Sequence, residues 1–202
     1  MSLRTSLAVA ASAAVLSVAL VGCAAPVASP LPTSTPAPSA EDSGAVEISA
    51  APATGEVFTG SGYQVTAPEG WTAPADAADR ADIFLIGDEE HADGFIDTLN
   101  VLLGPASTDS LEEYEAGGVE YLEVVKGATD VEVRPRVLLD DSVAVHISAL
   151  FHHSSGIQYW TEQYVVNAAN IGYTITFSFS ESVPMADREA LAESVLATWT
   201  WG

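Results

Sequence analysis

Regular alternation of apolar and polar residues marks the C-terminal half of this chain. The alternating runs are residues 129–139, 142–151, 157–166 and 171–179. A period of two is typical of strands with one buried face. The links between the runs hold only two to five residues, whereas a crossover between parallel strands needs about a dozen or more. The pattern therefore predicts a four-stranded antiparallel meander.

Three shorter strands and two helices complete the expected fold. The strands are residues 63–66, 81–86 and 97–103, and the helices are residues 107–125 and 184–199. The expected apolar face of the first helix consists of Leu111, Tyr114, Gly118, Leu122 and Val125. Gly117 and Gly118 should weaken this helix, since an interior glycine costs about 1 kcal/mol relative to alanine. The order of elements predicts an α+β domain, an antiparallel sheet covered by helices on its faces.

The N-terminal segment has the pattern of a secretory signal. Arg4 precedes an uncharged apolar run over residues 7–20, which fits a signal-peptide core and is short for a membrane span. The run ends in Leu-Val-Gly-Cys at residues 20–23, which resembles the bacterial lipobox. That resemblance implies cleavage between Gly22 and Cys23, a diacylglycerol on the Cys23 sulfur, and N-acylation, for example by palmitate. The alternative is that Cys23 is a small buried residue in an uncleaved anchor helix.

Composition divides the chain after this signal. Residues 24–54 are rich in Ala, Pro, Ser and Thr, and such a segment cannot bury enough apolar surface to offset its ordering entropy. We therefore expect a lipidated cysteine with a disordered tether over residues 23–55, and a folded domain over residues 56–202. Two or three acyl chains anchor a protein stably. The expected location is the extracytoplasmic face of the cell membrane.

Charge excludes several partners. The chain has 28 acidic and 6 basic residues, a formal net charge of −22. Such a surface repels nucleic acid and anionic head groups, so acyl chains rather than surface charge must hold the protein at a membrane. An acidic, alanine-rich chain with a single lysine is typical of high-GC actinobacteria. The single cysteine excludes an intramolecular disulfide and any zinc site with two thiolates.

Candidate metal ligands occur in two places. They are Asp88, Glu90, His91, His152 and His153. Residues 87–94 are expected to form an acidic loop between two strands, but its spacing does not match a calcium-binding loop. His152 and His153 would point to opposite faces of a strand unless the strand has ended. Hydrated hairpin ends are the favoured interpretation of both, so no metal and no cofactor are expected.

Aromatic residues offer the other candidate site. Trp71, Tyr159, Trp160 and Tyr164 are weak candidates for a groove that takes an apolar ligand or partner. Residues 157–166 are apolar on both faces, which equally fits a strand covered on both sides, and a core role is favoured. His146 lies on the less apolar face of its run and is expected to be structural or exposed. Motifs of common hydrolases and nucleotide-binding enzymes are absent from the sequence, and no catalytic residue is predicted.

Short motifs carry a family resemblance. Gly62-Tyr63, the stretch Pro68-Glu69-Gly70-Trp71 and a closing helix that ends at Trp199 resemble the PsbP-like α/β/α sandwich, and more narrowly the LpqN/LpqT-type lipoproteins of actinobacteria. The resemblance spans residues 58–201. It implies a non-enzymatic accessory or binding domain of the cell envelope.

The expected function is therefore that of a lipid-anchored binding or accessory protein that takes part in cell-envelope assembly. Its partner would be an unidentified envelope protein or an apolar ligand. The alternatives are a small apolar-ligand carrier and a metal-dependent hydrolase that uses His152, His153 and nearby acids.

Overall fold

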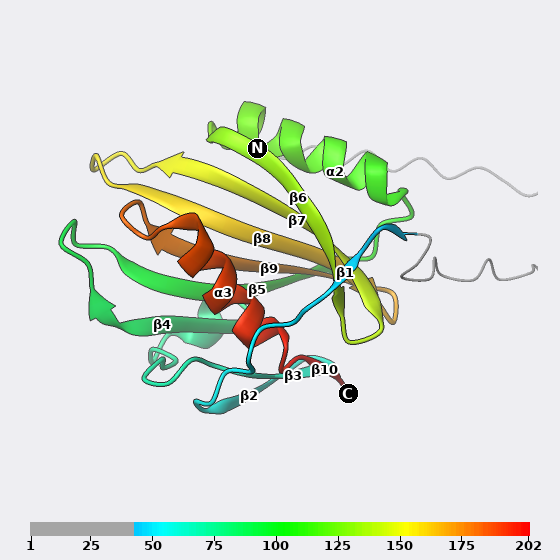
Figure 1. Ribbon diagram of the computed structural model, residues 1–202, viewed down its shortest axis with the longest axis horizontal. Coiled ribbons are helices and arrows are strands. Elements are labelled where there is room, and N and C mark those ends of the chain that lie inside the picture. Colours follow the sequence, from blue (N-terminus) through cyan, green and yellow to red (C-terminus); the bar gives the residue numbers. More distant parts are fainter. Residues whose placement is uncertain (1–42) are drawn as a thin grey trace, which may run out of the picture. The chain divides into compact units, whose positions relative to one another are not determined.

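The computed structural model describes residues 43–202, and these residues form a seven-stranded and a three-stranded sheet with two α-helices (Figure 1). The predicted signal peptide and Cys23 lie outside the described residues. The strands of the large sheet are β1 (Val46–Glu47), β4 (Ile83–Glu90), β5 (Ile96–Pro105), β6 (Thr129–Leu139), β7 (Ser142–His152), β8 (Gln158–Ala168) and β9 (Ile171–Ser180). Their spatial order is β1-β6-β7-β8-β9-β5-β4.

The predicted meander is confirmed, because β6, β7, β8 and β9 pair in sequence order and are antiparallel. The hairpin of β4 and β5 extends it through β5, which pairs with β9 in an antiparallel register that sets Val101 opposite Ile175. The sheet is nevertheless mixed rather than antiparallel throughout. Its β1 pairs in parallel with β6, Val46 lying opposite Val137.

The acidic segment over residues 87–94 is mostly strand rather than loop. Strand β4 continues to Glu90, with a register shift between Ile86 and Glu90, and the turn lies between Glu90 and Ile96. Because β4 is at the edge of the sheet, its charged residues can face water, and charged side chains are a common feature of edge strands. The expected loop was therefore placed several residues too early.

Residues 43–55 belong to the folded part, although the sequence assigns them to the tether. Besides the pairing of β1, the Ala53 amide donates to the Ser194 carbonyl at 2.8 Å, and the Gly55 amide donates to the Ala67 carbonyl at 2.9 Å. Ile48 and Ala53 pack against the main core. An existing sheet edge supplies backbone partners, so this segment is held with few apolar side chains of its own.

The small sheet has the order β10-β3-β2, with β2 (Val57–Gly60), β3 (Tyr63–Thr66) and β10 (Thr200–Trp201). Helix α3 (Met185–Leu196) precedes β10, and Pro184 is its N-cap. Trp199 lies beyond the end of α3, where its ring stacks on Tyr63 at 4.1 Å. These aromatic rings join the small sheet to the core beneath α3. A short 3-10 helix, η1 (Ala77–Asp79), precedes β4.

Helix α2 (Leu111–Glu120) begins four residues later than predicted and continues as a π-helix, η2 (Tyr121–Val125). Its start is set by a capping box, in which Ser110 Oγ accepts from the Glu113 amide at 3.2 Å and Glu113 Oε2 accepts from the Ser110 amide at 2.9 Å. Leu122 is buried as predicted, whereas Val125 is exposed. The wider π-turn shifts the side-chain spacing, which moves Val125 off the apolar face.

Alternate residues of β7 pack on different elements. Val145 and Ile147 form a small apolar cluster with Leu122 of η2 and with partly buried residues of α2. Ala144 belongs instead to the main core, together with Val195 of α3. Helix α2 contacts β6 and β7 (Figure 1), so the expected cover of helices over whole faces is incomplete. None of the described helices is long and apolar enough to cross a membrane.

Candidate functional site

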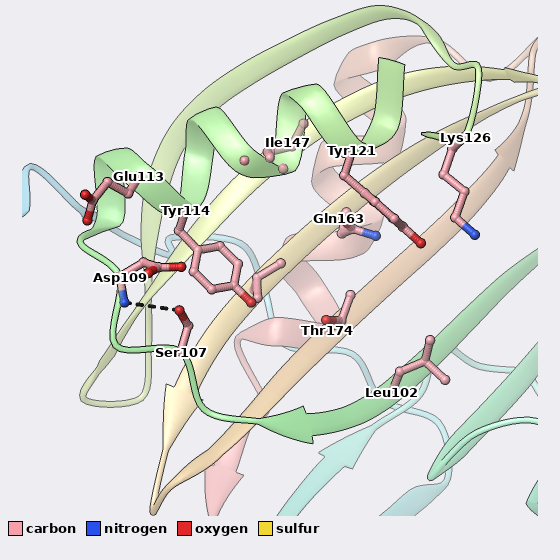
Figure 2. A pocket seen from close by; sticks show the side chains of 13 residues that line it. Leu102, Ser107, Asp109, Glu113, Tyr114, Tyr121, Lys126, Ile147, Gln163 and Thr174 are labelled. Carbon is pink, nitrogen blue, oxygen red and sulfur yellow. Dashed lines mark hydrogen bonds between the residues drawn. The ribbon is translucent and has the colours of Figure 1, made fainter. Parts of the chain in front are cut away.

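A groove lies between α2 and the face of the large sheet on which this helix packs (Figure 2). It encloses about 520 Å³, and we call it the α2 groove. Its floor comes from β5, β8 and β9 with Ile147 of β7, and its wall comes from α2, η2 and the residue that follows η2. The residues that define it are Leu102, Tyr114, Tyr121, Lys126, Gln163 and Thr174.

The floor is open because its side chains are short, polar or half-exposed. In the sheet register Val165 lies opposite Thr174, and Thr174 lies opposite Leu102, so all three face the groove. Gln163 Nε2 donates to Thr176 Oγ1 at 3.2 Å, which holds one floor amide in place. Leu102 is 48% exposed although it is a large apolar residue. The floor therefore offers both apolar surface and hydrogen-bonding groups.

Two glycines set the position of the groove wall. A Cβ atom on Gly118 would lie 2.6 Å from Ile147 Cδ1, so α2 approaches β7 closely at this residue. A Cβ on Gly117 would meet nothing within 4 Å, and Gly117 lines the groove. Both glycines lower the helix propensity of α2. Gly118 allows the helix to lie close to β7, and Gly117 leaves open space in the groove.

An arginine on β6 ties α2 to the sheet. Arg136 Nε donates to Glu115 Oε1 at 2.6 Å, and its terminal nitrogens donate to Glu112 and to the Ser43 carbonyl at 2.9 Å each. These carboxylates raise the pKa of Arg136 above its ordinary value, although burial opposes the shift. The same guanidinium thus connects α2, β6 and the first described residue of the chain.

Tyr114 separates the α2 groove from a second cavity of about 500 Å³. The two cavities share Asp109, Tyr114 and Val165, and the second is also lined by Ser43 and Arg136. Burial, and then the nearby charge of Asp109, raises the pKa of Tyr114. Its phenol is therefore neutral at physiological pH and divides a longer trough into two parts.

The structure also contains a buried ionic cluster that the sequence did not reveal. Glu162 of β8 is 0% exposed. Its Oε1 accepts from Arg188 Nε at 2.9 Å and from Ser148 Oγ at 3.1 Å, while His146 Nε2 lies 2.9 Å from its Oε2. We call these four residues the Glu162 cluster. The signal in the sequence that could have indicated this cluster was Glu162 itself, a carboxylate in the middle of residues 157–166, which are apolar on both faces.

The cluster fixes α3 to the sheet. Burial by itself raises the pKa of Glu162, but the hydrogen bonds from His146 and Arg188 outweigh it and lower that pKa below the ordinary value. The Arg188 guanidinium lies 4.4 Å from the ring centroid of Trp160 and also donates to the Val183 carbonyl. Solvent does not reach the Glu162 carboxylate. The role of the cluster is therefore structural: it attaches α3 to β8 through the Arg188–Glu162 ion pair.

The histidines among the metal-ligand candidates each hydrogen-bond to different neighbouring side chains and do not meet at one site. His91 Nε2 lies 3.0 Å from Asp97 Oδ1. His152 hydrogen-bonds Thr129 and Gln158, while His153 Nδ1 lies 2.8 Å from Ser155 Oγ. Within residues 43–202, no group of three or more His, Cys, Asp or Glu side chains is arranged to hold a metal ion.

The aromatic candidates do not share one groove, and none of the four lines the α2 groove. Trp71 and Tyr164 are buried in the main core, where His146 stacks on Tyr164 at 4.1 Å. Trp160 lies beneath Arg188. Tyr159 stacks against Phe95 and Phe151. Alternation along β8 sends Tyr159 and Trp160 to opposite faces.

No protein-family model and no curated protein matches this sequence. Solved structures match its fold. LpqN of Mycobacterium tuberculosis, described as involved in cell envelope biogenesis, is 13% identical with a TM-score of 0.51, over 71% of this chain and 85% of LpqN. The described part therefore has an LpqN-like fold, as the sequence resemblance implied.

Two further structures are more distant. Cyanobacterial PsbP (CyanoP) of Synechocystis sp. PCC 6803 is 13% identical with a TM-score of 0.46, over 73% of this chain and 92% of CyanoP. A protein of Bacteroides thetaiotaomicron is 16% identical with a TM-score of 0.42, over 69% of this chain. The match spans only 45% of that protein's length.

Proposed function

We propose that this protein is a lipid-anchored extracytoplasmic binding protein, and that the α2 groove is where it binds. The observation that carries the proposal is the groove itself. Its volume of about 520 Å³ lies within the range of small-molecule sites, which extends from roughly 300 to 1,000 Å³. Its lining combines apolar surface from Leu102 and Val165 with polar groups from Gln163 and Thr174. Such a lining suits reversible binding.

A place in the cell envelope is the second part of the proposal. It is supported by the LpqN-like fold, since LpqN is described as involved in cell envelope biogenesis, and by the lipobox at residues 20–23. Fold likeness supports function only by analogy. The PsbP-like α/β/α sandwich, with α2 and α3 on opposite sides of the sheet, is the architecture that we assign to this domain.

The proposed anchor can bring the groove to a membrane. Cys23 and Ser43 are 20 residues apart, a length of chain that spans at most about 70 Å when extended. Ser43 lines the cavity that adjoins the α2 groove across Tyr114. The chain from the anchor therefore joins the domain beside the proposed binding site.

Filling the groove is expected to abolish binding without unfolding the protein. In Gly117→Leu the new side chain would enter the open space beside α2, and the helix would gain about 1 kcal/mol of propensity from losing a glycine. We expect crosslinked complexes in a pull-down from intact cells to disappear in Gly117→Leu. Gly117→Ala is the matched control, because it gives a similar gain in propensity but adds a single methyl group. Equal crosslinking of both variants would contradict a binding role for the groove.

Loss of the thiol is expected to release the protein from the membrane. Cys23→Ser removes the sulfur that would carry the diacylglycerol, and no described helix is able to replace that anchor. We expect intact mass spectrometry to show no lipid mass, and fractionation to move the protein out of the membrane pellet. Ala24→Ser, which changes the neighbouring residue and keeps the thiol, should remain lipidated. Full membrane retention of Cys23→Ser would refute the anchor.

A further inference from the structure

One cation in the described part of the chain has no carboxylate partner. The four arginines of residues 43–202 all form ion pairs with aspartate or glutamate: Arg80, Arg134, Arg136 and Arg188. Lys126 forms none, although acids outnumber bases by 28 to 6 in this chain. Its ammonium lies instead 5.4 Å from the ring centroid of Tyr121. A lysine in this state retains N–H donors for an external anion.

Lys126 stands at one end of the α2 groove. Figure 2 shows Lys126 and Tyr121 at one end, with Tyr114 and Asp109 at the other. Asp109 and Glu113 line the Tyr114 end, so the groove has a cation at one end and two carboxylates at the other. An anionic group inside the groove is attracted to the Lys126 end and repelled from the Tyr114 end.

Apolar residues line the groove, and two exposed apolar residues precede Lys126 in the sequence. Leu102, Ile147 and Val165 line the space between the two ends. Just before Lys126, Val124 is 74% exposed and Val125 is 66% exposed. Neither valine lines the groove, so the apolar surface that a ligand would meet there comes from the three lining residues.

The dimensions suit an elongated ligand. Lys126 lies 12 positions after Tyr114. The six steps from Tyr114 to Glu120 rise roughly 9 Å along α2 at 1.5 Å per residue, and η2 and Lys126 extend the groove wall beyond that point. Tyr114 closes the far end of the groove. A single extended acyl chain can lie along such a trough, with its two ends near Lys126 and Tyr114.

We infer that the α2 groove binds a single-chain amphiphile with an anionic headgroup, its headgroup at Lys126 and its chain along the floor toward Tyr114. This inference rests on the proposed function and names its ligand class. Burial of the chain supplies most of the binding free energy. The charge pattern of the groove sets the direction in which the ligand enters. The anion is the carboxylate of a fatty acid or the phosphate of a phosphorylated amphiphile.

Calorimetric titration of the full lipidated chain in phosphatidylcholine nanodiscs tests this inference. Four probes share one lauryl chain and differ in headgroup: dodecanoate, dodecyl phosphate, neutral dodecyl maltoside and cationic dodecyltrimethylammonium. Empty nanodiscs supply the blank for partitioning into lipid. We expect one or both anions to bind more tightly than the neutral probe, and the cation to bind least. Whether the carboxylate or the phosphate is preferred distinguishes the two sources of the ligand.

Variants of Lys126 locate the headgroup. We expect Lys126→Met to weaken the preferred anion roughly fivefold, the effect of losing one exposed ion pair, and to leave dodecyl maltoside unchanged. Lys126→Arg should restore anion binding. Arg80→Met is the matched control, because it removes the same charge from an exposed pair with Asp76 that does not line the groove. Added salt should reduce the advantage of the anion.

The outcomes separate this inference from the proposed function. If dodecyl maltoside binds as tightly as both anions, or if Lys126→Met changes nothing, the ligand class is wrong. In that case, if Gly117→Leu still abolishes binding of dodecyl maltoside, the binding role of the α2 groove stands. If no probe binds, the ligand class is wrong as well, and the intact-cell crosslinking of Gly117→Leu decides the binding role independently.

Discussion

Replacing Arg188 with methionine is expected to lower the free energy of unfolding by about 3–5 kcal/mol, the usual cost of breaking a buried ion pair from one side. The substitution leaves Glu162 fully buried without its guanidinium partner. His146 and Ser148 still contact the carboxylate, but they replace only part of the lost interaction. Urea denaturation followed by circular dichroism measures the loss.

Two variants control this experiment. Arg80→Met breaks an exposed pair with Asp76, and such pairs are worth about 0–1 kcal/mol. The double variant Arg188→Met/Glu162→Gln removes both charges, and we expect it to recover much of the lost stability. A loss of less than about 1 kcal/mol in Arg188→Met would show that the Glu162 cluster does not hold α3 to the sheet.

The same cluster makes stability depend on pH. The folded protein lowers the pKa of Glu162 below the ordinary value of 4.5, because His146 and Arg188 donate to its ionised form. The resulting stability is fully present above pH 4.5 and is lost as the pH falls through the lower folded value. The acid-induced loss should therefore be smaller in Glu162→Gln than in the wild type over that window.

Replacing Trp199 with alanine is the second large effect that we expect, a loss of about 3–5 kcal/mol in the free energy of unfolding. Trp199 is 3% exposed, stacks on Tyr63 at 4.1 Å and meets Tyr173 and Trp201 edge-on at 6.4 and 5.5 Å. These rings connect the small sheet to the main core, so the cavity would lie where the two sheets meet.

Thermal and urea unfolding of Trp199→Ala measure this loss. Trp199→Phe is the matched control, since a smaller ring can keep the stack on Tyr63 and should lose less. A loss below about 1 kcal/mol in Trp199→Ala would mean that the small sheet is held by other contacts, such as the hydrogen bond from the Tyr173 hydroxyl to the Ser61 carbonyl at 3.0 Å.

Stability and binding are expected to separate in this protein. Glu162 and Trp199 belong to the α3 side of the sheet, whereas Lys126 and Gly117 belong to the α2 groove. Substitutions of Glu162 and Trp199 should lower the unfolding free energy. Substitutions of Lys126 should change binding at nearly constant stability, and those of Gly117 should change binding while the helix gains about 1 kcal/mol of propensity. This division arises because one set of alternate residues along β7 and β8 lies in the core and the other lies under or beside α2.

Local patterns were sufficient for part of the fold. Alternation with a period of two, together with short links, predicts the meander of β6 to β9 correctly. Helical spacing places both helices, but not their ends. The capping box at Ser110 and the π-turn after Glu120 are local choices among competing hydrogen bonds, and several residues near each end offer similar alternatives.

The candidate site was not predictable in the same way. The aromatic residues singled out from the sequence lie in the core or on opposite faces, while the α2 groove depends on residues from β5, β8, β9 and η2 that are far apart in the chain. Lys126 is conspicuous only when the partners of the four arginines within residues 43–202 are known. Pairing between distant residues leaves no periodic signal in the sequence.

The sequence by itself determined the strand meander, the approximate positions of the helices and the acidic character, because each depends on neighbouring residues or on composition, and the lipobox resemblance at residues 20–23 stays a prediction. Only the tertiary structure decided that β5 pairs with β9, that residues 43–55 join the sheet, and that Arg188 neutralises Glu162 from 26 residues away. It also left Lys126 without a carboxylate partner among residues 43–202, beside an open groove floor. These outcomes depend on which surfaces meet when the chain folds.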